Sequence, residues 1–213
     1  MTPPNSIPRR FQSSAAGWLG ALVLLLALAP ARGVAQKPPP PPALAAGQLL
    51  VASPRSRDPR FQKTVILLIE VNSEGTAGMV LNQPGNLPLA ALFASVDAAH
   101  GRTDHAYWGG PVEPTRQICL LNSTGPLREA RQLLPGLFFS TTQALMRLAL
   151  NAQQPSSVFR VYLGYTGWGR GQLQAEIAHG GWTVLPGSIA LVFDANPATL
   201  WTRLTTSVPA PRG

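Results

Sequence analysis

The chain has 213 residues, of which 45% are hydrophobic and 12% are charged, and this balance suits one globular domain with a sizeable core. The single cysteine, Cys119, excludes an internal disulfide and a CxxC metal site. The formal net charge is +8, but the basic residues are scattered arginines and form no run of five or more. The charge therefore gives no specific indication of direct nucleic-acid binding.

The N-terminal segment has the pattern of a signal peptide. Arg9 and Arg10 form a basic start, and residues 15–29 are apolar or small and carry no charge. Small residues follow and end at Ala35, which is the arrangement that a signal peptidase cleaves. The sequence therefore predicts cleavage after Ala35 and export of the protein to the periplasm or the medium.

Three alternatives stay open for residues 1–35. Cleavage could follow Ala31 instead. The segment could also remain as an uncleaved N-terminal anchor, in which case residues 15–29 would be the part of the chain that contacts the membrane. Finally, the gene start could be overextended, with translation beginning at a codon such as that of Val34, and the protein would then be cytoplasmic.

Residues 36–46 are predicted to be a proline-rich linker. Lys37 is followed by five consecutive prolines, which fix φ and remove amide donors, so this segment is expected to act as a stiff tether. The folded domain is predicted to span residues 47–208, and residues 209–213 are predicted to be a disordered tail.

Within the domain, apolar runs alternate with turn residues in an irregular order of strands and helices. Strands are predicted at residues 48–53, 64–71, 79–81, 116–121, 137–140, 158–163 and 189–193. Helices are predicted at residues 89–96, 141–151, 172–179 and 197–204, and a polar loop at residues 98–105. The hairpin formed by the second and third strands argues against a doubly wound parallel sheet.

The helix over residues 141–151 is amphipathic. Leu145, Leu148 and Ala149 are expected to face the core, and Ser140 or Thr141 is expected to be the N-cap.

Three residues with reactive or titratable side chains have structural interpretations. Asp58 is expected to accept hydrogen bonds from nearby amides in a turn, with Phe61 inserted into the core. Cys119 lies in an apolar strand and is expected to be a small core residue. His179 is expected at the end of a helix, where an imidazolium interacts favourably with the helix dipole.

The most distinctive segment runs from Gly164 to Ile177 and continues to Trp182. Its glycines are expected to end the preceding strand and to let the chain turn sharply into a helix, while Trp168 packs over the turn. The helix that follows is expected to bury a face made of Leu173, Ile177 and Ala178 and to stop at Gly180-Gly181, before Trp182 opens the next strand.

A second glycine pair lies in the segment Trp108-Gly109-Gly110-Pro111-Val112. Paired glycines allow another segment to approach the backbone closely, or they leave amides free for a ligand. The segment carries no GK[ST] ending and opens no predicted helix, so nucleotide binding is not indicated and a structural turn is the preferred interpretation.

These two segments, together with the strand at residues 48–53, resemble the YqgE/AlgH family of small bacterial proteins. The resemblance implies an α+β single domain with a mixed, largely antiparallel sheet curled into an incomplete barrel with flanking helices. Many members carry histidine where this chain has Val71 and glutamate where it has Gln174. A role that depends on that imidazole is therefore not available to this chain.

The resemblance implies no defined reaction, although one branch of the family is associated with transcriptional control of alginate production. The sequence lacks GxSxG, HExxH and Walker motifs, and no catalytic residue, metal site or cofactor is predicted. The first hypothesis is a non-enzymatic binding or regulatory module with a protein or small-molecule partner. The alternative is a small hydrolase or ligand-modifying enzyme that acts at the glycine-rich turn of residues 164–176.

Six residues are the candidates for ligand binding under either hypothesis. They are Trp168, Arg170, Gln172, Glu176, Gly109 and Gly110. Gln172 and Glu176 are one helical turn apart and share a face, where Glu176 could contact a polar ligand or accept hydrogen bonds from the turn itself.

Overall fold

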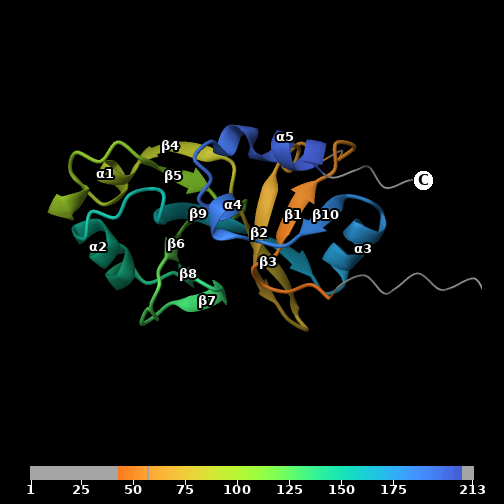
Figure 1. The fold of residues 1–213 in the computed structure, drawn as a ribbon, viewed down its shortest axis with the longest axis horizontal. Coiled ribbons are helices and arrows are strands. Elements are labelled where there is room, and N and C mark those ends of the chain that lie inside the picture. Colours follow the sequence, from red (N-terminus) through yellow and green to blue (C-terminus); the bar gives the residue numbers. More distant parts are fainter. Residues whose placement is uncertain (1–42, 57, 208–213) are drawn as a thin grey trace, which may run out of the picture. The chain divides into compact units, whose positions relative to one another are not determined.

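The structure, a computed structural model, describes residues 43–56 and 58–207 (Figure 1). The predicted signal peptide of residues 1–35, most of the linker of residues 36–46 and the tail of residues 209–213 lie outside the described residues and stay predictions. No helix within the described part is long and apolar enough to span a membrane.

The described residues form ten strands, five α-helices and one short 3₁₀ helix. The strands are β1 (Leu49–Ala52), β2 (Val65–Val71), β3 (Gly75–Val80), β4 (Pro84–Pro88), β5 (His105–Trp108), β6 (Val112–Asn122), β7 (Arg131–Leu134), β8 (Leu137–Ser140), β9 (Phe159–Gly169) and β10 (Trp182–Leu185). The helices are α1 (Leu89–Leu92), α2 (Gln143–Asn151), α3 (Gln172–Ala178), α4 (Ile189–Val192) and α5 (Pro197–Ser207), with η1 at Asp97–Ala99.

All ten strands belong to one sheet, whose main path has the order β10-β1-β2-β3-β9-β6-β8-β7. Neighbours along this path are antiparallel, while β5 pairs in parallel with β9 and antiparallel with β4. The sheet curls into a half-barrel with flanking helices (Figure 1). The expected α+β single domain, with a mixed and largely antiparallel sheet, is confirmed.

The long strand β9 corrects one expectation. Its glycines were expected to end the strand near Leu163, but the strand continues to Gly169. Gly164 has φ +71°, a conformation that glycine adopts without a steric penalty. The chain therefore bends at Gly164, and the strand resumes beyond it. The first half of β9 therefore pairs with β6, and the second half, from Thr166 onward, pairs with β3.

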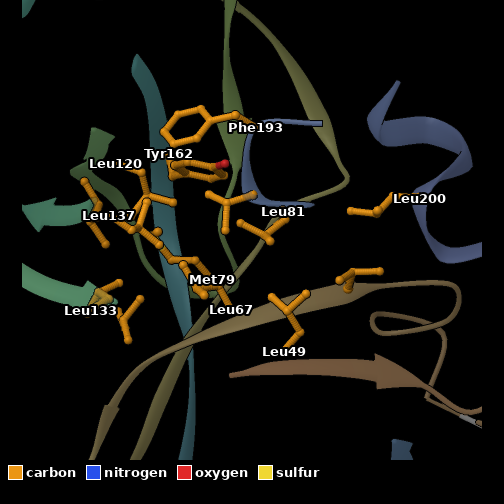
Figure 2. Close-up of a cluster of buried hydrophobic side chains, with 14 residues drawn as sticks. Leu49, Leu67, Met79, Leu81, Leu120, Leu133, Leu137, Tyr162, Phe193 and Leu200 are labelled. Atoms are coloured by element: carbon orange, nitrogen blue, oxygen red, sulfur yellow. The ribbon is translucent and has the colours of Figure 1, made fainter. Parts of the chain in front are cut away.

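Three groups of buried side chains fill the domain. One of them, shown in Figure 2, gathers residues of seven strands, among them Tyr162 of β9, with Phe193 and Leu200. A second group lies under α1 and α2 and contains Cys119, which is fully buried as expected. The third group lies under α3 and contains both Trp168 and Trp182. This third group forms the base of the candidate site.

The segment predicted as the last buried strand, residues 189–193, is the short helix α4 instead. An apolar run of this length has no periodicity that distinguishes a strand from a buried helix. Ser188 favours the helix, because its hydroxyl oxygen accepts a hydrogen bond from the Leu191 amide at 3.3 Å and caps the helix start.

Helix α2 begins at Gln143, and its N-cap is Thr142 instead of Ser140 or Thr141. The Ser140 hydroxyl is buried and donates to the Glu129 carbonyl at 2.7 Å, so its position is fixed by the neighbouring loop. The inward residues are Leu145, Met146, Ala149 and Leu150. Leu148 was expected among them, but its side chain is 63% exposed.

The region between β3 and β6 is more extended than predicted. Helix α1 ends at Leu92 and does not reach residue 96. The strands β4 and β5, which the sequence did not reveal, pair with each other on either side of it. Prolines at both ends of β4 obscure its pattern, since proline within a run argues against a strand.

Candidate functional site

The glycine-rich segment places α3 directly beyond the end of β9. Gly171 has φ +74° and lies immediately before Gln172, the first residue of the helix. The Gln172 side chain ties the start of α3 to the end of β9, because its Oε1 accepts a hydrogen bond from the Gly169 amide at 3.1 Å. This contact orients the first turn of α3 so that Glu176, one turn later, points back toward Trp168.

The carboxylate of Glu176 is held by three side-chain donors. Its Oε2 accepts hydrogen bonds from the indole N–H of Trp168 at 3.0 Å and from that of Trp182 at 2.8 Å. Its Oε1 accepts a hydrogen bond from Gln172 Nε2 at 2.9 Å. Hydrogen bonds to a charged acceptor are stronger than those between neutral groups, so this network fixes both indole rings.

The two indoles form an aromatic wall with Phe61. Trp168 and Trp182 are only 6% and 8% exposed, and their rings meet edge to face with centroids 6.0 Å apart. Phe61 also meets Trp182 edge to face, with ring centroids 6.1 Å apart. Phe61 is half-buried, as its predicted insertion toward the core requires.

A cleft of about 1080 Å³ opens beside this wall. It is lined by the end of β1, the loop of residues 53–56 and 58–61, Pro111 and Val112, the end of β9, helix α3, the turn that enters β10, and the last turns of α5. Its lining includes the side chains of Arg55, Ser56, Asp58, Arg60, Phe61, Trp168, Gln172, Glu176, His179, Trp182, Leu204 and Thr205. The cleft therefore combines an aromatic wall with polar and charged groups, the composition of a typical ligand site.

The charged groups of the cleft are partly paired. Arg60 Nη2 lies 2.8 Å from Asp58 Oδ2, and the Arg60 amide donates to Asp58 Oδ1 at 3.0 Å, so the turn expected at Asp58 is confirmed. The hydrogen bond from the Arg60 guanidinium holds the pKa of Asp58 below its usual value. Arg55 is exposed and has no carboxylate partner within the described residues.

His179 directly follows α3, as expected, and lines the cleft. Its Nδ1 lies 2.7 Å from the carbonyl oxygen of Ala175, which can only accept, so Nδ1 carries a proton and donates it. The helix buries Leu173 fully and Ile177 partly, whereas Ala178, expected on the same buried face, is exposed. The chain leaves α3 at Gly180, whose φ of +74° ends the helix as predicted.

The structure brings together three of the six candidate residues. Trp168, Gln172 and Glu176 meet at the cleft, while Arg170 is exposed and does not line it. Gly109 and Gly110 do not line it either, and they lie against the bend of β9.

Gly109 is embedded in the sheet. Its amide donates to the Leu163 carbonyl at 2.8 Å, and its carbonyl accepts from the Val80 amide at 3.0 Å. A Cβ atom on Gly109 would lie 2.2 Å from the Gly164 oxygen, and one on Gly110 would lie 2.3 Å from the Tyr165 carbonyl. The pair therefore permits a close backbone approach, in agreement with the structural interpretation of this segment.

Sequence reasoning did not assign Trp182, Phe61 or α5 to the site. Trp182 was placed at the end of the distinctive segment and at the start of a strand but was not counted among the ligand-binding candidates, although its polar N–H requires a partner when the ring is buried. The local sequence does not indicate that Leu204 and Thr205 line the cleft, because α5 reaches the cleft only through tertiary packing. Among the described residues, no group of three or more His, Cys, Asp or Glu is arranged to hold a metal ion.

Comparisons with known proteins identify the family of this chain. The AlgH-like family model, DUF179, matches residues 49–211. Over 157 residues the chain is 41% identical to a UPF0301 protein of Myxococcus xanthus, covering 72% of this chain and 84% of that protein. A UPF0301 protein of Chromobacterium violaceum is 32% identical over 149 residues.

Solved structures give the same result. The solution structure of the AlgH protein from Pseudomonas aeruginosa matches with a TM-score of 0.64 and 28% identity, covering 82% of this chain and 97% of that one. A crystal structure of a Corynebacterium diphtheriae protein matches with a TM-score of 0.67, covering 79% and 90%, and at 23% identity it supports the fold alone. The chain belongs to the AlgH-like family, DUF179 or UPF0301, whose function is uncharacterised.

Proposed function

We propose that the protein is a non-enzymatic binding or regulatory module whose ligand site is the cleft beside α3. The observation that carries this proposal is the state of Glu176. Both of its carboxylate oxygens accept hydrogen bonds from neighbouring side chains, two of them indoles that are themselves nearly buried. A general acid or base must reach the substrate's proton, and Glu176 is committed to the protein instead.

The arrangement favours a preformed surface over a reactive group. The hydrogen bonds of Glu176 hold Trp168 and Trp182 in fixed orientations, so a ligand that contacts this wall loses little free energy to side-chain ordering. A volume of about 1080 Å³ accommodates a drug-sized molecule or a few residues of a polypeptide. The mixture of aromatic, cationic and hydroxyl groups suits a ligand that has both an apolar body and polar substituents.

A blocking substitution tests this proposal. Thr205 lines the cleft from α5, whereas its neighbour Thr206 is exposed and does not. Both are threonines in the same helix, so Thr205→Arg and Thr206→Arg change charge and helix propensity equally. Purified domains would be screened against a library of small aromatic and polar fragments by ligand-observed NMR, with melting temperatures as the control for folding.

We expect fragments that bind the parent domain and Thr206→Arg but bind Thr205→Arg at least tenfold more weakly. Equal binding by the two variants would contradict the proposal, because the ligands would then occupy another part of the surface. Turnover of a library member, with the same dependence on Thr205, would contradict the non-enzymatic part of the proposal.

A further inference from the structure

Strand β10 lies at one end of the sheet order and pairs with β1 alone. Its four residues, Trp182–Leu185, are aromatic, β-branched or aliphatic, a composition that favours extended structure. Natural proteins commonly protect a free edge with a charged residue, a bulge or a covering segment. Within these four residues there is no charge, and the pairing with β1 runs without a register shift.

The register fixes which main-chain groups face the free edge. The Ser53 amide donates to the Gly181 carbonyl at 2.9 Å, so these two residues form a hydrogen-bonded pair of the antiparallel ladder. Such pairs alternate with non-hydrogen-bonded pairs, so the next hydrogen-bonded partners are Val51 with Thr183 and Leu49 with Leu185. The amides and carbonyls of Trp182 and Val184 consequently point away from β1.

Those outward groups have no protein partner in the described part of the chain. No backbone hydrogen bond joins Trp182 or Val184 to another described segment, and no described side chain bonds to their main-chain atoms. Two amides and two carbonyls, two residues apart, are the repeat that an additional strand requires. The edge of β10 therefore offers the donors and acceptors that one additional strand needs.

This edge runs directly into the cleft. Gly180, Gly181, Trp182 and Thr183 all line the cleft, so the start of β10 is one of its walls. A strand that paired with Val184 and continued past Trp182 would enter the space beside the aromatic wall. Main-chain hydrogen bonds would then supply affinity, and the side chain placed in the cleft would supply selectivity.

We propose that the ligand of the cleft is an extended segment of a partner protein, which adds to the free edge of β10 and places an apolar or aromatic side chain against Trp182 and Phe61. This inference rests on the proposed function of the cleft. A second copy of the chain fits less well. In an antiparallel β10 pair, the segment after Leu185 of the other copy would approach the cleft, but Pro186 has no amide to donate and Gly187 has no side chain to place against the aromatic wall.

The probe is a displayed library of random 12-residue peptides, from which binders to the parent domain are selected and synthesised. Hydrogen exchange of the backbone amides is then measured by NMR with and without peptide. We expect the amides of Trp182 and Val184 to exchange at least tenfold more slowly in the complex. The amides of Thr183 and Leu185, already bonded to β1, serve as internal references.

Two variants supply an independent readout. Val184→Pro removes one outward amide, and an edge strand tolerates proline where the amide points away from the sheet. Val184→Thr keeps that amide and retains a β-branched side chain. We expect Val184→Pro to weaken peptide binding about tenfold and Val184→Thr to bind within twofold of the parent. If Val184→Pro fails to fold, N-methylation of alternate peptide residues tests the same hydrogen bonds from the peptide side.

Each contrary outcome separates the two proposals. Peptides that depend on Thr205 but leave the Trp182 and Val184 amides unchanged would overturn strand addition and keep the cleft as a ligand site. Fragments that bind while the library yields no peptide would overturn it in the same way. Protection of the two amides without peptide, rising with protein concentration alongside a dimer in sedimentation, would overturn it in favour of a second copy.

Discussion

The indole N–H groups of Trp168 and Trp182 both donate to one oxygen atom, Glu176 Oε2. The two tryptophans come from β9 and β10, and three strands, β1, β2 and β3, separate β9 from β10 in the sheet. Their rings can meet at 6.0 Å only because the sheet curls. Glu176 therefore ties two distant strands together, and the cleft exists on the surface that this contact shapes.

Removal of the Glu176 carboxylate should destabilise the domain. Glu176→Ala leaves two nearly buried indole N–H groups without an acceptor, and we expect a loss of about 3 kcal/mol in the free energy of unfolding. Glu176→Gln keeps one acceptor oxygen for the indoles and should cost about 1 kcal/mol. Urea unfolding followed by tryptophan fluorescence measures both. Equal stability of Glu176→Ala and the parent would show that the network does not hold the wall.

Trp168 should contribute through both packing and its N–H. Since its side chain is only 6% exposed, Trp168→Ala is expected to cost roughly 3–5 kcal/mol, the range for truncation of a buried aromatic residue. Trp168→Phe retains an aromatic ring but loses the donor to Glu176, and about 2 kcal/mol is expected. Thermal unfolding of the two variants distinguishes these contributions, and an unchanged melting temperature for Trp168→Ala would contradict the buried placement.

The glycine pair should be intolerant of a methyl group. In Gly109→Ala the new Cβ would lie 2.2 Å from the Gly164 carbonyl oxygen, so the backbone of β9 must move. We expect a destabilisation of roughly 1–3 kcal/mol, as for other overpacked sites. Gly125→Ala is the matched control, because its Cβ would have no neighbour within 4 Å and the backbone has no positive φ. A neutral Gly109→Ala would return this segment to the list of candidate ligand sites.

Cys119 should be inert in the folded protein. Burial in the core raises the pKa of its thiol to about 12, so at pH 8 the reactive thiolate is almost absent. Iodoacetamide should leave the native domain unmodified for hours and should alkylate it rapidly in denaturant, where the pKa returns toward its usual value. Mass spectrometry reads out the modification, and fast alkylation of the native domain would mean that this core opens readily.

Helices and strands with a clear pattern of residue types in their own sequence were predicted correctly. The apolar strands β1, β2, β6 and β8 and the helices α2, α3 and α5 appear where residue type and spacing place them. The strand predicted at residues 189–193 was wrong because a short apolar segment fits either a strand or a buried helix, and here Ser188 caps a helix. The end predicted for β9 was wrong as well. A glycine can either end a strand or bend it, and here the residues after the glycine pair with β3, so the strand continues.

The candidate site shows the same division. Gln172 and Glu176 were placed on one helical face by spacing alone, and Trp168 was placed beside them by the turn. Trp182, Phe61 and Thr205 could not be assigned, since the curl of the sheet and the docking of α5 bring them to the cleft. Arg170 was included by proximity in sequence, but the direction of the turn leaves it outside the cleft.

The most direct test of the cleft as a ligand site is the ¹H–¹⁵N NMR signal of the two indole N–H groups during titration with a fragment or peptide selected for binding. The indoles of Trp168 and Trp182 share one acceptor, so a ligand against this wall should shift both signals together and in proportion to occupancy. A ligand that binds while both indole signals stay fixed, with shifts at an outlying surface such as that around Leu148 of α2, would contradict the assignment of the site.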